Sequence, residues 1–196
     1  MKTKKKRAAG RLFFLIGIAL LAAAAVLLIS WQWGIRTWDE KADDYVHTIC
    51  TIIPAPQSAV LEDRRDDTMP ALALDGTDFV GILEMPIYDS VLPVSNSWGQ
   101  SDRYPCRFSG SIYDGTMQIG ATSQAGQYEF FREISVGDPL YFTDMEGNRY
   151  AYEVKNLRYE KHADAAALTR EEAALTLFIK NIYAFEYIIV FCDVMH

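Results

Sequence analysis

Six side chains could supply nucleophilic or proton-transfer chemistry, namely Cys50, Cys106, Cys192, His47, His162 and His196. A cysteine thiolate attacks carbonyl carbon, and an imidazole moves a proton near neutral pH. His162 falls in a polar stretch between a predicted strand and a predicted helix, and we interpret all three histidines as solvated. Three cysteines are too few for a disulfide-built scaffold, and their odd number leaves at least one thiol in a monomer. The fold must therefore rest on a packed core.

Other reaction chemistries have no motif in the sequence. It contains no Gly-x-Ser-x-Gly turn, no phosphate-binding loop, and no pair of His or Cys residues at metal-ligand spacing. We therefore expect neither a cofactor nor a metal ion.

An apolar run near the N-terminus predicts one transmembrane helix over residues 12–33. Leu12–Ser30 carries no charge and, at ~1.5 Å of rise per residue, is long enough to cross a hydrocarbon core of ~30 Å. Trp31 and Trp33 follow it, and their amphipathic rings suit the headgroup layer. The run is longer than the apolar part of a usual signal peptide, and no small-x-small cleavage site precedes a polar stretch. These features favour a retained anchor over a cleaved signal peptide.

The charges on either side of this helix predict its orientation. Residues 1–11 contain six Lys and Arg and no acidic residue, so the positive-inside rule predicts a cytoplasmic tail and an exported remainder. The remainder has the other 13 of the 19 Lys and Arg and all 26 Asp and Glu, a formal charge of −13. So acidic a domain does not bind nucleic acid through its phosphates. We expect a single-pass protein of the cell membrane whose C-terminal domain is extracellular.

The exported part divides into an expected stalk, residues 34–76, and a domain, residues 77–196. Asp39–Cys50 could continue as a short helix, whereas the prolines and the charged run at 62–67 suit an exposed linker or an extended first arm. From Asp78 onward, short apolar or alternating runs broken by turn residues predict a mostly β fold, a barrel or a sandwich. The predicted strands are Phe79–Glu84, Ser90–Val94, Thr116–Gly120, Pro139–Thr143, Arg149–Asn156, Leu175–Lys180 and Tyr187–Cys192.

Two local patterns complete the prediction for this domain. Thr169–Glu172 has the form of a capping box and predicts a short helix. Tyr128, Phe130 and Phe131 either line a groove or pack a short helix onto the barrel.

Six motifs occur in a fixed order from Asp78 to the C-terminus: Asp78–Pro86, Leu92–Trp98, Pro105–Ser111, Val136–Asp138, Phe142–Asn148 and Leu175–Phe178. In this order, and behind an N-terminal anchor, they resemble the sortases, which are cysteine transpeptidases on the outer face of Gram-positive membranes. The resemblance is closest to the class B-like and class D-like members. It implies an eight-stranded β-barrel with short helices and an exposed groove that receives a sorting peptide.

The resemblance also implies three catalytic groups: a thiolate that attacks the peptide bond, a histidine that protonates the leaving amine, and an arginine that steadies the oxyanion. At the matching positions this chain has Lys180, Thr122 and Tyr187, respectively. A threonine cannot shuttle a proton near neutral pH, and a lysine cannot form the thioester. Lys180 either binds a carboxylate or a peptide carbonyl, or reaches solvent from the strand end. These three residues and Ser123 are the candidates for lining a peptide groove.

The cysteines have separate interpretations. Similar sortases often carry a second cysteine at the place of Cys192, so the resemblance implies a small core residue there, with a disulfide to Cys106 as the alternative. Cys50, near the membrane, could pair between two chains.

Three hypotheses for function follow. The first is an inactive pseudo-sortase that binds a surface-protein or pilin sorting signal, or partners an active sortase. The second is an active transpeptidase that attaches surface or pilin proteins to the cell wall, in which Cys192 or Cys106 serves with His162. The third is a structural surface protein that binds no peptide.

Overall fold

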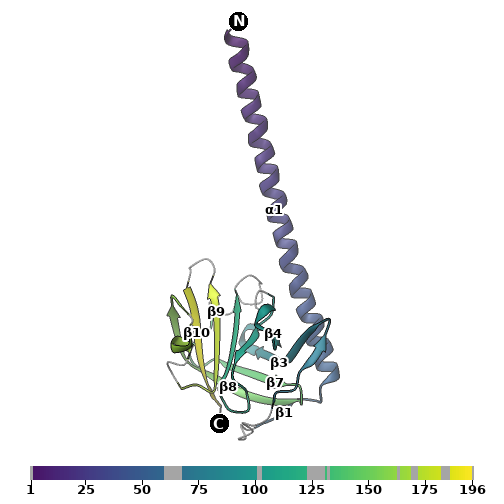
Figure 1. Ribbon diagram of the computed structural model, residues 1–196, viewed down its shortest axis with the longest axis vertical. Coiled ribbons are helices and arrows are strands. Elements are labelled where there is room, and N and C mark those ends of the chain that lie inside the picture. The colour runs from purple at the N-terminus through teal and green to yellow at the C-terminus, as the bar shows by residue number, and fades with distance from the viewer. Residues whose placement is uncertain are drawn as a thin grey trace. The chain divides into compact units, whose positions relative to one another are not determined.

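A computed structural model describes residues 2–59, 68–100, 103–122, 131, 133–162, 164–168, 172–181 and 186–195 (Figure 1). The chain forms two compact units, Met1–Thr37 and Trp38–His196, and helix α1 (Lys2–Ile52) contributes to both. Within the first unit, Phe14–Gly34 is long and apolar enough to span a membrane. Its side chains are exposed, as a lipid-facing helix requires.

The second unit is built on a closed β-barrel. Its eight strands in the described part of the chain are β3 (Thr77–Met85), β4 (Ser90–Ser95), β5 (Cys106–Ser109), β6 (Met117–Thr122), β7 (Pro139–Asp144), β8 (Asn148–Glu160), β9 (Leu175–Asn181) and β10 (Glu186–Val194). Around the barrel they follow the order β3-β4-β5-β6-β9-β10-β8-β7, and β7 pairs with β3 to close the ring. The pairs β4–β5 and β6–β9 are parallel and the others antiparallel, so the barrel is mixed.

Five short elements accompany the barrel: β1 (Gln57–Ser58), β2 (Leu72–Leu74), the 3-10 turns η1 (Pro86–Tyr88) and η2 (Trp98–Gln100), and helix α2 (Ala165–Leu168). All seven strands predicted from the sequence are confirmed. The strands that the prediction missed are β1, β2 and β5, each of four residues or fewer, because so short a run shows no alternation.

The barrel encloses the main core, and alternation along each strand decides which side chains enter it. On β9, Leu175, Leu177 and Ile179 are buried in this core. Because successive side chains of a strand point to opposite faces, the residues between them face the outside of the barrel. Buried apolar surface contributes about 25 cal/mol per Å², so this pattern fixes the register of β9.

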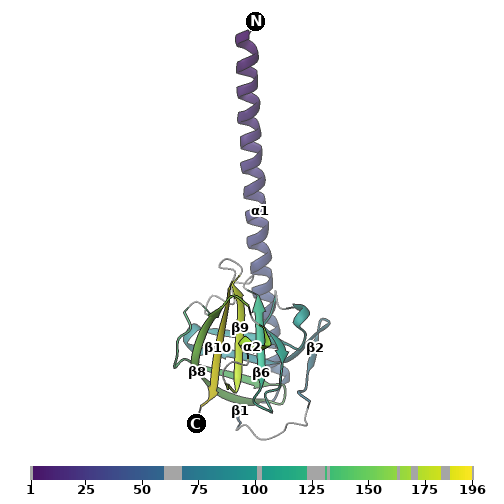
Figure 2. The ribbon, with the colours of Figure 1, turned by 60° about the vertical axis from the view of Figure 1, so that its left-hand side comes forward.

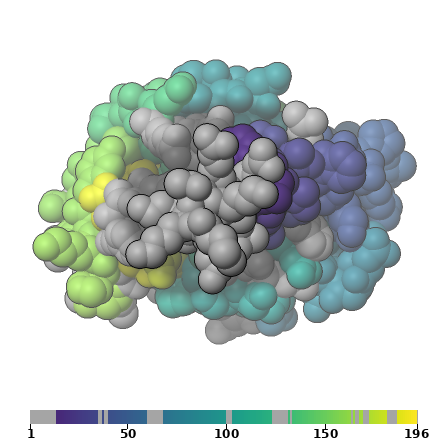
Figure 3. Space-filling view, turned by 90° about the horizontal axis from the view of Figure 1, so that it is seen from above, coloured from purple at the N-terminus to yellow at the C-terminus, as the bar shows by residue number. Residues whose placement is uncertain are grey.

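Part of the segment expected as a stalk, residues 34–76, packs on the outside of the barrel. Ala42 and Ile49 of α1 are fully buried in an apolar cluster that includes Phe79, Ile82 and Tyr104. Strand β2 pairs with β3, and β1 with β8. Figure 3 shows the blue atoms around residue 50 on the side of the domain opposite the green-to-yellow atoms of the last strands. The expected linker run at 62–67 lies outside the described residues.

Helix α2 directly precedes the predicted capping box, Thr169–Glu172, in the chain. Helix α2 begins after Asp164, whose Oδ1 accepts a hydrogen bond from the backbone N–H of Ala167 at 2.8 Å. An aspartate in this position satisfies a helix N–H that has no partner within the helix. Glu172 is not helical, and the rest of the predicted capping box, 169–171, lies outside the described residues.

Candidate functional site

Thr122, Lys180 and Tyr187 lie in one row across three neighbouring strands. Thr122 of β6 pairs with Lys180 of β9, and Lys180 pairs with Tyr187 of β10. Adjacent strands are ~4.8 Å apart, so the row is about 10 Å wide. Figure 2 shows β6, β9, β10 and β8 side by side. The fold thus brings together three positions, the outermost of which, Thr122 and Tyr187, are 65 residues apart in sequence. The fourth candidate, Ser123, lies outside the described residues.

This row faces the outside of the barrel, at the end where β6 and β9 finish and β10 begins. Lys180 alternates with the inward-facing Ile179, and its side chain is exposed. Tyr187 is half-buried and packs against a small outer cluster formed by α2 and the outward residues of β9 and β10. Glu160 of β8 pairs with Tyr187 and extends the row to a carboxylate.

The row offers a hydroxyl, an ammonium and a phenol. Among the described residues Lys180 has no ion-pair partner, and an ammonium donates up to three hydrogen bonds to carboxylate or carbonyl oxygens. The hydroxyl groups of threonine and tyrosine are poor proton acceptors near neutral pH. The row therefore offers hydrogen-bond donors and acceptors and one cation to a ligand.

Three aromatic side chains form a cluster beside this row, which we call the aromatic cluster: Trp98, Phe108 and Phe178. Their ring centroids lie 5.2, 5.3 and 5.5 Å apart in pairs, within the range of favourable ring contacts. Phe178 is only 3% exposed, whereas Trp98 is 39% and Phe108 is 45% exposed. Two large rings therefore remain open to solvent around a buried one.

Gly120 makes room for this cluster. A Cβ at this position would lie 2.6 Å from both Phe178 Cε2 and Trp98 Cζ3, and closer still to Phe178 Cζ. The absence of a side chain lets the Phe178 ring lie against the backbone of β6. The cluster was not predicted from the sequence, because its three members come from separate segments; the glycine in a buried strand was the one available signal.

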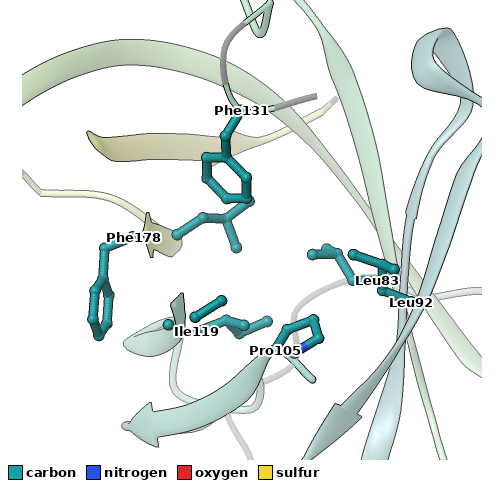
Figure 4. Close-up of a pocket in the computed structure, with 9 residues that line it drawn as sticks. Leu83, Leu92, Pro105, Ile119, Phe131 and Phe178 are labelled. Atoms are coloured by element: carbon teal, nitrogen blue, oxygen red, sulfur yellow. The ribbon is translucent and has the colours of Figure 1, made fainter. Parts of the chain in front are cut away.

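A small apolar pocket lies at the same end of the barrel (Figure 4). Leu83 and Leu92 lie on one side of it and Phe178 on the other, and Phe131 also lines it. Its volume of about 10 Å³ is that of one water-sized sphere. Phe131 is 5% exposed and belongs to the main core, so it lines this small pocket and not an open groove, while Tyr128 and Phe130 lie outside the described residues.

Cys192 lies in the barrel interior, far from the row. It is fully buried in the main core and pairs with Leu175, five residues before Lys180 on β9, which at ~3.3 Å per residue is about 17 Å. Burial raises the pKa of the Cys192 thiol, and the Asp193 charge adds to this effect. A buried neutral thiol is a poor nucleophile. His162 is exposed and follows Glu160, the last residue of β8, whereas Cys192 pairs with Val154 of that strand, six residues before Glu160.

The other two cysteines also carry thiols, so the Cys106–Cys192 disulfide alternative is wrong for this structure. Cys106 is fully buried, and its Sγ donates to the Tyr104 carbonyl oxygen at 3.3 Å. Cys50 is exposed on α1, and partial burial, followed by the Glu84 charge, raises its pKa. Neither thiol belongs to the row.

The barrel is similar to those of solved sortases. A Clostridium perfringens sortase D5 transpeptidase has 12% sequence identity over 61% of this chain and 80% of that chain, with a TM-score of 0.51. Sortase C1 from Streptococcus agalactiae has 17% identity over 63% of this chain and 71% of that chain, also at 0.51. Clostridium perfringens sortase C, solved with the C-terminal cell wall sorting motif, has 18% identity over 61% and 71%, at 0.50.

No protein-family model and no curated protein sequence matches the chain. The likeness to the solved structures is one of fold. The domain is a closed, mixed eight-stranded β-barrel of the sortase fold, preceded by an apolar helix that could span a membrane.

Proposed function

We propose that this protein is a membrane-anchored pseudo-sortase, of class B-like or D-like origin, that binds peptides without cleaving them. The observation that carries the proposal is the row of Thr122, Lys180 and Tyr187. The resemblance assigns the catalytic histidine, cysteine and arginine to these positions, and the register of β6, β9 and β10 places all three side by side on the outer face. If one of these positions had been matched wrongly to the family pattern, the three residues would not be expected to pair across adjacent strands.

The burial of Cys192 supports the same proposal. The alternative, an active transpeptidase acting through a displaced cysteine, requires a thiolate within reach of a peptide carbonyl and an imidazole within hydrogen-bond distance of it. Cys192 is enclosed by the main core, and the exposed His162 follows the distant end of β8. Opening the barrel to bring them together would expose much of its apolar interior, which is strongly unfavourable.

The proposed placement is the outer face of the cell membrane. The six basic residues in 1–11 favour a cytoplasmic N-terminus. Residues 12–33 would then form the anchor, and the residues after them an extracellular domain. There the domain would meet exported chains. The solved C. perfringens sortase C with its sorting motif illustrates the kind of ligand that this fold can hold, and a secreted sorting signal, or an active sortase, is the partner we propose here.

Binding is tested with the full-length chain in detergent micelles. Fluorescently labelled sorting-signal peptides are titrated, and anisotropy reports their dissociation constants. We expect saturable binding that weakens on Lys180→Ala, with Lys155→Ala, which removes an exposed lysine of β8, as the matched control. Absence of saturable binding for every peptide would favour the purely structural hypothesis.

A further inference from the structure

The aromatic cluster has the properties of a contact surface for an apolar group. Trp98 and Phe108 are 39% and 45% exposed, although both contact the almost fully buried Phe178 ring, Trp98 at a tilt of 30° and Phe108 edge-on at 87°. Phe178 is held between them and the outer cluster beneath α2. Aromatic side chains have only two side-chain torsions, so they lose little side-chain entropy when a ligand covers them, and burial of apolar area then stabilises the complex.

Lys180 lies beside this surface at a defined spacing. It follows Phe178 by two residues on β9, and both side chains point to the outer face. The rise of a strand places them about 6.6 Å apart along its axis. The ammonium has no ion-pair partner among the described residues, and it stands out as an exposed cation in a part of the chain whose formal charge is −13.

An extended peptide has the same repeat. Its side chains at positions i and i+2 fall on one face, also about 6.6 Å apart. A peptide running along β9 therefore sets an apolar side chain next to Phe178, whose ring lies 5.5 Å from that of Trp98 and 5.3 Å from that of Phe108, when a carboxylate two residues away reaches Lys180. The positive charge of Lys180 selects an acidic group at this ligand position, because a lysine there would be repelled by the Lys180 ammonium.

We infer that the site takes an extended peptide in which one residue separates an apolar side chain from a carboxylate, the carboxylate binding Lys180 and the apolar side chain covering Trp98 and Phe108. This inference rests on the proposed function, since it names the class of peptide for the same surface. It adds a spacing rule and a charge requirement that the proposed function does not contain.

The test uses the full-length chain in micelles with Trp31→Phe, Trp33→Phe and Trp38→Phe, so that Trp98 alone reports by fluorescence. The peptides have Leu-Ser-Glu and Glu-Ser-Leu cores, because either strand direction fits. Gln in place of Glu provides charge controls, and a Leu-Glu-Ser core is the spacing control. A carboxylate hydrogen-bonded to an ammonium is worth about tenfold in affinity. At least one Glu peptide is expected to shift the Trp98 emission and to bind about tenfold more tightly than its Gln partner and the spacing control.

Lys180→Ala is expected to bring the Glu and Gln peptides to equal affinity, while Lys155→Ala keeps the difference. Equal binding of Glu and Gln peptides to the chain with Lys180 intact overturns this inference and leaves the proposed function standing. Failure of these peptides, together with failure of all sorting-signal peptides, overturns both. Circular dichroism of each variant confirms that the barrel is folded, so a loss of binding reports the site.

Discussion

Gly120→Ala is a sensitive test of the aromatic cluster. The new methyl group would lie 2.6 Å from Phe178 Cε2 and from Trp98 Cζ3, closer than any ordinary contact. Phe178 is only 3% exposed, whereas Trp98 is 39% exposed and can swing toward solvent. We therefore expect Trp98 to leave the cluster.

The size of the effect follows from these contacts. Overpacking costs typically 1–3 kcal/mol, and loss of a ring pair costs ~0.5–1.5 kcal/mol. If Trp98 moves away, part of the overpacking cost is replaced by the cost of losing its ring contacts. We therefore expect a loss of about 2 kcal/mol in the free energy of unfolding. For a chain of this size, ~1 kcal/mol corresponds to ~2–4 °C, and the expected fall in Tm is about 4–8 °C.

Thermal unfolding followed by circular dichroism measures the fall, and the emission of Trp98 as sole tryptophan should move to longer wavelength. Gly99→Ala is the matched control, because its Cβ would meet nothing closer than Ser97 Oγ at 3.7 Å. Adding Phe178→Ala to Gly120→Ala should make the two changes non-additive, since the methyl group then has room. A stable Gly120→Ala variant with unchanged Trp98 emission would refute the packing described for the cluster.

Three further predictions concern the rest of the domain. Ile49→Ala should lower the free energy of unfolding by about 2–5 kcal/mol, and Ile52→Ala, at a 55% exposed position of the same helix, by less than ~0.5 kcal/mol; equal effects in denaturant titrations would mean that α1 does not pack on the barrel. Tyr152→Phe should maintain or raise Tm, because the buried Tyr152 hydroxyl has no hydrogen-bond partner among the described residues; Tyr113→Phe, which loses a bond to the buried Asp144, should lower it. Burial raises the pKa of Tyr152 and of Cys192, so their contribution to stability is complete below the unfolded pKa values of 10.0 and 9.0 and falls as the pH rises above them. The Tm measured from pH 8 to 11 should therefore fall above about pH 9, and Tyr152→Phe should make the fall at the upper end of this range less steep. A Tm that rises over this range would contradict the burial of both groups.

Short apolar or alternating runs made most of the barrel predictable. Seven strands are longer than five residues, and their bounds agree with the prediction to within a few residues. Alternation is clear on β8, whereas the middle of β3 and of β10 is buried without interruption. Strand β5 has only Cys106–Ser109, too short for a period of two to be visible. The apolar residues 14–34 were equally clear, because length and composition alone indicate a helix that could span a membrane.

Long-range packing was beyond sequence patterns. Ala42 and Ile49 lie on a helix rich in charge, and nothing local indicates that Phe79 and Tyr104 cover them. Likewise, Trp98, Phe108 and Phe178 meet only because β5, β6 and β9 are neighbours in the barrel. The resemblance placed Thr122, Lys180 and Tyr187 at matching positions, and the structure puts them in one row; their roles stay a prediction.

The decisive measurement is the intact mass of the full-length protein after incubation with a sorting-signal peptide and an amine acceptor. A protein that binds without cleaving keeps its mass, and the peptide stays whole while anisotropy reports saturable binding. An acyl adduct on the protein together with a cleaved peptide, both lost on Cys192→Ala, would contradict the proposal and establish an active transpeptidase.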